Sequence, residues 1–192
     1  LNVQESGVYP RIPINIAIDT TAPTVTSVSS TADNGTYGIG STIAITITFS
    51  ESVTVTGTPQ LTLETGDTDA VVNYSSGSGS TTLTFNYTIA AGHTSSDLDY
   101  ASGSPLQPNG GTIKDAAGND ATRTLPTVGG TSSLGGSKAL VIETTAPTIS
   151  STAPATNAYV NNTKVSYTLS EAIASGTITW TRTGGTEDSN SP

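Results

Sequence analysis

Two blocks of sequence occur twice in this chain of 192 residues, in the same order. Residues 16–25 (IAIDTTAPTV) are matched by residues 140–149 (LVIETTAPTI), an offset of 124. Residues 45–53 (ITITFSESV) are matched by residues 165–173 (VSYTLSEAI), an offset of 120. Matched blocks in a fixed order indicate a structural module that is repeated along the chain, so each copy begins where the preceding copy ends.

The repeat predicts how the chain is divided into domains. Residues 19–142 form one complete unit, residues 1–18 supply the last strand of a preceding unit, and residues 143–192 begin the next unit. The final segment then holds less than half of a unit. Its strand edges would be exposed unless something pairs with them.

Within the complete unit, apolar residues occupy every second position of residues 43–49 and 83–89. This period is typical of strands that bury one face. Shorter strands are predicted at residues 24–28, 60–64, 70–74, 98–100, 112–114 and 139–142, and the segments between them are rich in Asn, Asp and Gly. In the following unit, residues 165–169 alternate in the same way. Roughly seven to nine short strands without a helical period predict an all-β sandwich.

The composition limits which partners the chain can bind. It has 15 acidic residues against 6 basic ones, a formal charge of -9 and a pI of about 4.2. This charge argues against binding to nucleic acid or anionic membranes and favours metal cations. The absence of Cys excludes disulfides, thiolate zinc sites and cysteine nucleophiles.

The sequence shows neither a membrane span nor a signal peptide. No apolar run approaches the roughly 18 residues that cross a bilayer. The chain opens on Leu1-Asn2-Val3, without a basic region followed by an apolar one. We therefore expect it to be a fragment of a longer protein.

Four stretches carry a family resemblance: residues 19–24 (DTTAPT), 48–51 (TFSE), 55–61 (VTGTPQL) and 111–120 (GTIKDAAGND). They resemble the bacterial immunoglobulin-like repeats of large secreted or cell-surface adhesins, of the RTX or biofilm-associated type. The resemblance covers most of residues 14–173. It implies immunoglobulin-like β-sandwiches in tandem, an extracellular or cell-surface location, often in Gram-negative bacteria, and no enzymatic activity.

A group of acidic and amide residues is predicted to share one end of the complete unit. Successive loops of a sandwich fall at alternate ends, which brings Asp19, Glu51, Asp115, Asn119 and Asp120 together. Oxygen ligands in flexible loops suit calcium, and a divalent ion also relieves the repulsion between crowded carboxylates. We therefore expect a calcium site at or near each inter-domain junction.

The next junction would use Glu143 and Glu171, the repeat counterparts of Asp19 and Glu51. Acidic residues at the opposite end of the complete unit would face that junction; they are Asp33, Asp67 and Asp69. An alternative explanation stays open, because tight turns also select Asp, Asn and Gly, and an acid at a strand end is often simply solvated.

Catalytic patterns are weak in this sequence. The single histidine, His93, lies in a polar loop without the Gly-x-Ser-x-Gly elbow of a serine hydrolase. Asp97 and Asp99 have the carboxylates of a glycosidase, but few aromatic residues are present to line a sugar cleft. We expect no enzymatic activity.

The predicted function is that of a structural spacer in a long extracellular stalk or filament, with neighbouring repeats as its partners. Pro23 and Pro147 restrict the linkers and limit bending between units. One alternative is a recognition module for glycans or a host protein, with Tyr37, Tyr100 and Tyr159 as candidate contacts. Another is a self-assembling filament subunit that is completed by a strand from a neighbouring chain.

Overall fold

The computed structural model describes residues 17–154, 164–173 and 175–179. The chain divides into two compact units, with unit 1 ending at Thr144 and unit 2 beginning at Thr145. We describe each unit by itself. The strand expected in residues 1–18 lies outside the described residues, apart from residues 17 and 18.

The regular elements of unit 1 are strands, apart from one helical turn. The elements in chain order are β1 (Val25–Ser30), β2 (Gly35–Tyr37), β3 (Thr42–Thr56), β4 (Gln60–Leu63), β5 (Ala70–Ser76), β6 (Ser80–Thr88), β7 (Leu106–Gln107), β8 (Thr112–Lys114), α1 (Leu134–Ser137) and β9 (Leu140–Ile142). None of the described residues belongs to a helix long and apolar enough to span a bilayer.

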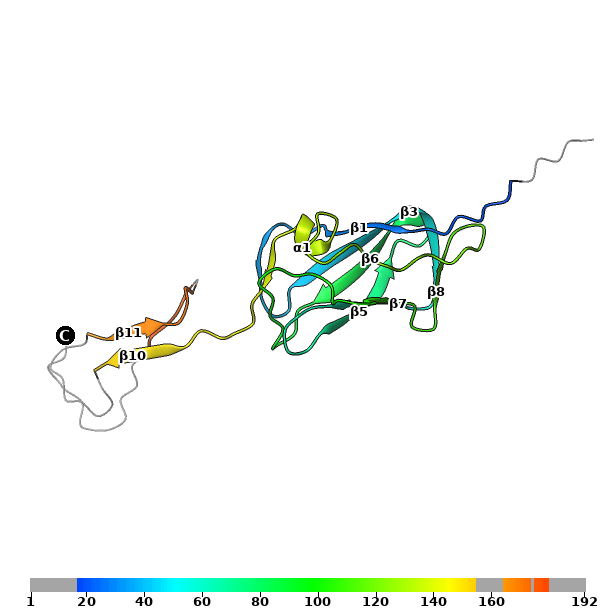
Figure 1. The fold of residues 1–192 in the computed structure, drawn as a ribbon. Helices are drawn as coiled ribbons and strands as arrows, with labels where there is room; N and C mark the ends of the chain where they lie inside the picture. Colours follow the sequence, from blue (N-terminus) through cyan, green and yellow to red (C-terminus); the bar gives the residue numbers. More distant parts are fainter. Residues whose placement is uncertain (1–16, 155–163, 174, 180–192) are drawn as a thin grey trace, which may run out of the picture. The chain divides into compact units, whose positions relative to one another are not determined.

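One curled antiparallel sheet provides most of this unit (Figure 1). Its strands follow the order β1-β3-β6-β5-β4-β7, while β8 pairs with β3 off this path and β2 pairs in parallel with β9. β3 pairs with β6 from Thr42 to Thr48 and again, after a register shift, at Val53, whereas its last residues, Thr54–Thr56, pair with β8. A strand that changes partner along its length turns a corner, so the sheet folds over into two layers.

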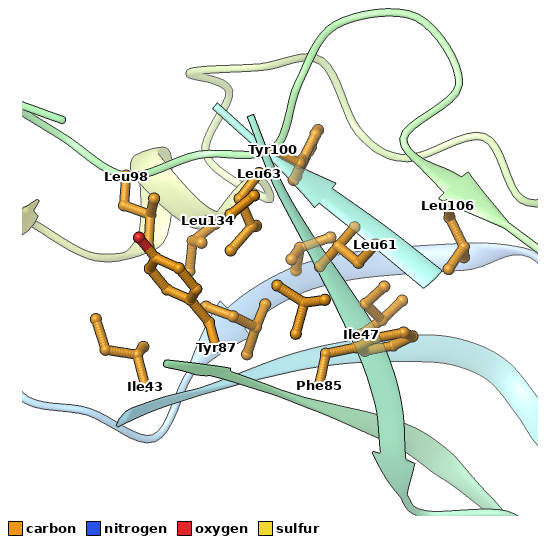
Figure 2. Packing of buried hydrophobic residues seen from close by; sticks show 14 of the residues in the cluster. Ile43, Ile47, Leu61, Leu63, Phe85, Tyr87, Leu98, Tyr100, Leu106 and Leu134 are labelled. Atoms are coloured by element: carbon orange, nitrogen blue, oxygen red, sulfur yellow. The ribbon is translucent and has the colours of Figure 1, made fainter. Parts of the chain in front are cut away.

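The apolar core lies between these layers, as the alternation predicted. Each of the apolar residues in the alternating positions of residues 43–49 and 83–89 is at most 2% exposed. Figure 2 shows Ile47, Phe85 and Tyr87 on one side of the core and Leu61 and Leu98 on the other. The predicted all-β sandwich is confirmed.

The single histidine supports this packing. The Tyr87 hydroxyl and His93 Nδ1 share a hydrogen bond of 2.9 Å, and the two rings stack with their centroids 5.7 Å apart. Burial raises the pKa of the Tyr87 hydroxyl to about 12. The nearest polar partner of the His93 ring is thus a core tyrosine.

Several strands differ from the sequence-based expectation. Residues 98–100 form no ladder, and Tyr100 makes a single bridge to Leu63. Residues 33–35 (DNG) have the composition of a turn, but Gly35 begins β2, because its partner is the distant β9 and no local pattern reveals that pairing. β3 continues beyond Glu51 to Thr56 because β8 takes over as its neighbour.

Unit 2 contains two antiparallel strands among its described residues, β10 (Ile149–Ala153) and β11 (Ser166–Leu169). Both lie within the segment expected to begin a further sandwich. That expectation stays a prediction.

Candidate metal centre

Three carboxylates from distant parts of the chain converge at one end of unit 1. Asp19 lies in the linker before β1, Glu51 lies in β3, and Asp115 follows β8. One carboxylate oxygen from each residue lies within 4.8 Å of the other two. The sequence predicted that these three residues would share one end of the sandwich, and the structure places them together.

Glu51 stands at an inward position of β3. Side chains alternate between the two faces of a strand, so Glu51 shares its face with Phe49 and Val53, which are 2% and 1% exposed. Burial raises the pKa of the Glu51 carboxyl, and the charges of Asp19 and Asp115 raise it further. The charged form of Glu51 is therefore less favourable here than in a freely solvated glutamate.

Asp115 comes two residues after Ile113, so its side chain lies on the same inward face as that of Ile113, and the residue is 6% exposed. Burial raises the pKa of its carboxyl, but hydrogen bonds from Asn119, Gly118 and Ala117 outweigh that effect and lower it. The Asn119 backbone N–H donates to Oδ1 over 2.8 Å, and its side-chain Nδ2 donates to Oδ2 over 2.7 Å. These bonds keep Asp115 ionised and fix its orientation.

The linker joins the cluster through Asp19 and Thr21. The Thr21 N–H donates to Asp19 Oδ1 over 2.9 Å, which fixes the carboxylate in a local turn. Asn119 Nδ2 lies 3.2 Å from the carbonyl oxygen of Asp19 and 3.3 Å from that of Thr21. Asn119 therefore ties the linker to the loop that carries Asp115.

The remaining candidate ligands lie elsewhere or have other partners. Asn119 is adjacent, its side-chain nitrogen donates to Asp115 and to the linker, and its role as a ligand through Oδ1 stays a prediction. Asp120 is largely exposed and forms an ion pair of 3.0 Å with Lys114. The Glu143 N–H donates to the carbonyl of Tyr37, at the end of unit 1 where β3 begins. Glu171 is an exposed residue of unit 2.

The chain leaves unit 1 at the end opposite the carboxylate cluster (Figure 1). The Thr144 hydroxyl donates to the carbonyl of His93 over 2.9 Å and accepts from the Gly92 N–H over 3.1 Å. The linker on this side is therefore held by the loop that follows β6.

The distances within the cluster suit a large, hard cation. Oxygens that share one calcium ion at about 2.3–2.6 Å from it lie at most about 5 Å apart. The three carboxylates meet this condition, since their ligand atoms lie within 4.8 Å. They offer hard oxygen donors, the class that calcium prefers over softer metals.

Asp99, one of the acids considered for catalysis, has a structural environment instead. Its Oδ1 accepts from the Tyr100 N–H, and its Oδ2 accepts from the Gly129 N–H and the Ser133 hydroxyl. The side chain is 6% exposed. Asp97, two residues earlier, is exposed. The three hydrogen bonds that the Asp99 carboxylate accepts thus come from donors inside unit 1, in its own segment and in the loop before α1.

The tyrosines considered for ligand recognition are poorly placed for it. Tyr100 is 2% exposed and its hydroxyl donates to the carbonyl of Pro126. Tyr37 is half-buried and donates to the carbonyl of Asp33 over 2.7 Å. Tyr159 lies outside the described residues.

Two strand layers around one apolar core, with the chain entering and leaving at opposite ends, define a modular β-sandwich domain. The family model of the bacterial Ig-like domain matches residues 19–128, more than half of the chain, and the chain belongs to this family. Domains of this family are commonly structural repeats of bacterial surface proteins and are generally non-catalytic. Comparison with curated proteins and with solved structures gives no match.

Sequence reasoning missed the roles of Ser50 and Asn119. Ser50 Oγ accepts from the Thr24 N–H over 3.0 Å and so holds the end of the linker against β3. Ser50 recurs as Ser170 in the second repeated block, and this repetition could have indicated a structural role for the serine. Asn119 was expected as a ligand, which stays a prediction, and its hydrogen bonds to Asp115 and to the linker were not foreseen.

Proposed function

We propose that the chain is a non-catalytic spacer of a bacterial cell-surface adhesin, in which calcium bound by Asp19, Glu51 and Asp115 stiffens the junction before unit 1. The observation that carries the proposal is the convergence of these three carboxylates within 4.8 Å. Asp19 belongs to the linker, whereas Glu51 and Asp115 belong to the domain. A shared cation would therefore join the linker to the domain.

The rest of the linker supports this function, because it is already fixed to unit 1. Pro23 is buried, and its carbonyl accepts from the Thr122 N–H over 2.8 Å. Thr24 forms a parallel bridge with Thr122. Movement of the linker is then confined to the few residues around Asp19, which are the residues that a bound cation would restrain.

The proposed affinity is that of an extracellular module. Calcium sites in such modules have dissociation constants of about 0.1–1 mM. Three carboxylates without a surrounding cage of further side chains are consistent with this range. The site would then be filled outside the cell and respond to the calcium concentration there.

Calcium is expected to raise the melting temperature of unit 1. At calcium about tenfold above the dissociation constant, the gain is about 1.4 kcal/mol, or roughly 5 °C for a domain of this size. Differential scanning calorimetry of the full chain in calcium and in chelator measures the shift. Hydrogen exchange should slow at residues 19–22, which reports on the linker itself.

Asp115→Asn should abolish both calcium responses, and Asp33→Asn is the matched control, because it removes an acid at the other end of unit 1. Equal melting temperatures with calcium and with chelator in the wild-type chain would contradict the metal site. A calcium-induced shift that persists in Asp115→Asn would assign the ion to other residues.

Glu51→Gln is expected to have opposite effects with and without calcium. Because the pKa of Glu51 is raised above its ordinary 4.5 in the folded chain, its stability contribution is present at low pH and is lost as pH rises through the folded-state pKa. Glutamine removes this loss, so at pH 7 in chelator the variant should melt above wild type. In calcium it should gain less than wild type.

Thermal melts from pH 4 to pH 8 in chelator test the sign of this effect. The stability difference between Glu51→Gln and wild type should grow with pH. A difference that stays constant over this interval would show that the neighbouring charges do not act on Glu51.

A further inference from the structure

A groove of about 400 Å³ lies on the surface of unit 1, between two segments that are distant in the sequence. Residues 103–107, which include β7, contribute one side, and residues 121–124, which follow the Asp115 loop, contribute the other. Leu106 is 1% exposed, and the other lining residues are polar or small. The groove has the volume of a small-molecule site and presents mainly hydrogen-bonding groups to a ligand.

Arg123 lines this groove and differs from the other basic residues that the structure describes in unit 1. Lys114 forms an ion pair with Asp120, and Lys138 Nζ donates to the carbonyl of Ala32 over 2.8 Å. Arg123 is exposed and makes no hydrogen bond or ion pair with any described residue. Its planar guanidinium is therefore available to bind a carboxylate through two parallel hydrogen bonds.

Hydroxyl and amide groups lie in the same groove. The hydroxyls of Ser104, Thr122 and Thr124 have no hydrogen-bond partner in the part of the chain that the structure describes. Gln107 Nε2 donates to the carbonyl of Ser104 over 2.6 Å, which leaves the side-chain oxygen of Gln107 to accept from a ligand. Because a hydroxyl both donates and accepts, these side chains match a ligand that carries several hydroxyls.

The groove continues into an apolar part. Gly103 also lines a neighbouring groove of about 320 Å³, together with Pro105 and with residues 125–128. Val128 in this part is 48% exposed. Sugar rings combine apolar C–H faces with hydroxyl edges, so the apolar part would cover the faces while the polar part fixes their orientation.

We propose that the two grooves bind a saccharide that carries a carboxylate, a uronic acid, with its carboxylate at Arg123. One cation balances one negative charge, whereas a doubly charged group such as phosphate would add repulsion in a chain of formal charge -9. A polypeptide strand fits the site less well, because β7 has only two residues and its edge is too short for strand addition. The inference goes beyond the spacer function and does not depend on calcium.

A galacturonate trisaccharide tests the proposal on the full, isotope-labelled chain in chelator, which prevents calcium from bridging the saccharide to Asp19, Glu51 and Asp115. Backbone amide NMR signals of residues 103–107 and 121–124 should shift during the titration. The neutral galactose trisaccharide, with CH2OH in place of each carboxylate, is the matched control. It should bind at least about tenfold more weakly, since it lacks the charge-assisted hydrogen bonds to Arg123. Equal affinities, or no binding of the galacturonate, would overturn the proposal.

Variants of Arg123 test which group holds the carboxylate. Arg123→Gln should weaken galacturonate binding at least about tenfold, and Arg123→Lys should weaken it less, because lysine keeps the charge without the planar fork. Both variants should fold as wild type, since the side chain has no partner among the described residues. Lys138→Gln makes the same change in net charge and should leave the affinity unchanged. Equal losses in Arg123→Gln and Lys138→Gln would contradict a specific contact.

Two further outcomes would also overturn the proposal. A glutamate-containing peptide that shifts the same signals at lower concentration than the galacturonate would show that a polypeptide supplies the carboxylate. Galacturonate-induced shifts confined to residues outside the two grooves would place the saccharide elsewhere on the chain.

Discussion

Asp99→Ala is expected to destabilise unit 1 by about 4 kcal/mol, because hydrogen bonds to a buried charge contribute about 1.5–3 kcal/mol each. The carboxylate accepts from the Tyr100 N–H, the Gly129 N–H and the Ser133 hydroxyl, at 2.8–3.0 Å. Alanine would leave these donors without an acceptor. The desolvation of the charge, which the variant no longer requires, offsets part of the loss.

This effect would extend beyond one contact, because Asp99 connects two parts of the fold. Ser133 caps α1 by accepting from the Gly136 N–H over 3.0 Å, and α1 contributes the fully buried Leu134 to the core. Losing the carboxylate should therefore release residues 127–137 from the segment that holds Leu98 and Tyr100.

Chemical denaturation measures the change in the free energy of unfolding. Asp97→Ala is the matched control and should change stability by less than about 0.5 kcal/mol, because its side chain is exposed. Asp99→Asn keeps the side-chain volume, but its amide NH2 would face an N–H or O–H group that now donates to the carboxylate. This variant should therefore also be less stable than wild type. Wild-type stability in Asp99→Asn would refute the proposed role of the charge.

Gly111→Ala is expected to destabilise unit 1 by about 3 kcal/mol, the upper range for inserting an atom into a packed site. A Cβ at this position would overlap the carbonyl oxygen of Thr56, a backbone atom that cannot rotate away. Gly57 shows the same close approach from the other side, since its Cβ would lie 2.8 Å from the Gly111 Cα. The two glycines allow the end of β3 to approach the turn before β8.

The same variant should weaken calcium binding. Displacement of β8 moves Asp115, which directly follows it, away from Glu51 in β3. Calorimetric titration with calcium, under conditions where the variant is folded, measures this loss. Gly38→Ala is the matched control, because its Cβ would make an ordinary contact of 3.6 Å with the Glu143 carbonyl oxygen. Normal stability in Gly111→Ala would mean that the backbone can shift at no cost.

The sequence was sufficient to predict the parts of the fold that depend on local pattern. Residues 43–49 and 83–89 alternate strictly, and their apolar members are the buried core. The alternation of loops between the two ends was also sufficient to bring Asp19, Glu51 and Asp115 together. Both results follow from the period of two and the length of the strands.

Long-range pairings and side-chain roles could not be predicted in this way. The parallel pairing of β2 with β9 joins Gly35 to Leu140, and neither segment carries a local signal for the other. Asp99 resembles any loop acid until its three donors are known. Such roles depend on which loops meet in space, and turn-forming residues look alike in every loop.

One signal was present in the sequence and was not used. Continuing the alternation of residues 43–49 by one step puts Glu51 on the inward face of its strand, between Phe49 and Val53. In the second block, Glu171 occupies the same step between Leu169 and Ile173. An acid at an inward position needs a compensating charge or partner, which distinguishes it from a solvated acid at a strand end.

The position of the two linkers determines how unit 1 responds to tension. The linker before β1 and the linker after β9 leave from opposite ends, so a pulling force acts along the strands. The hydrogen bonds between β1 and β3 lie across that direction. They are loaded in shear and must yield together, whereas a hairpin pulled from one end opens one bond at a time.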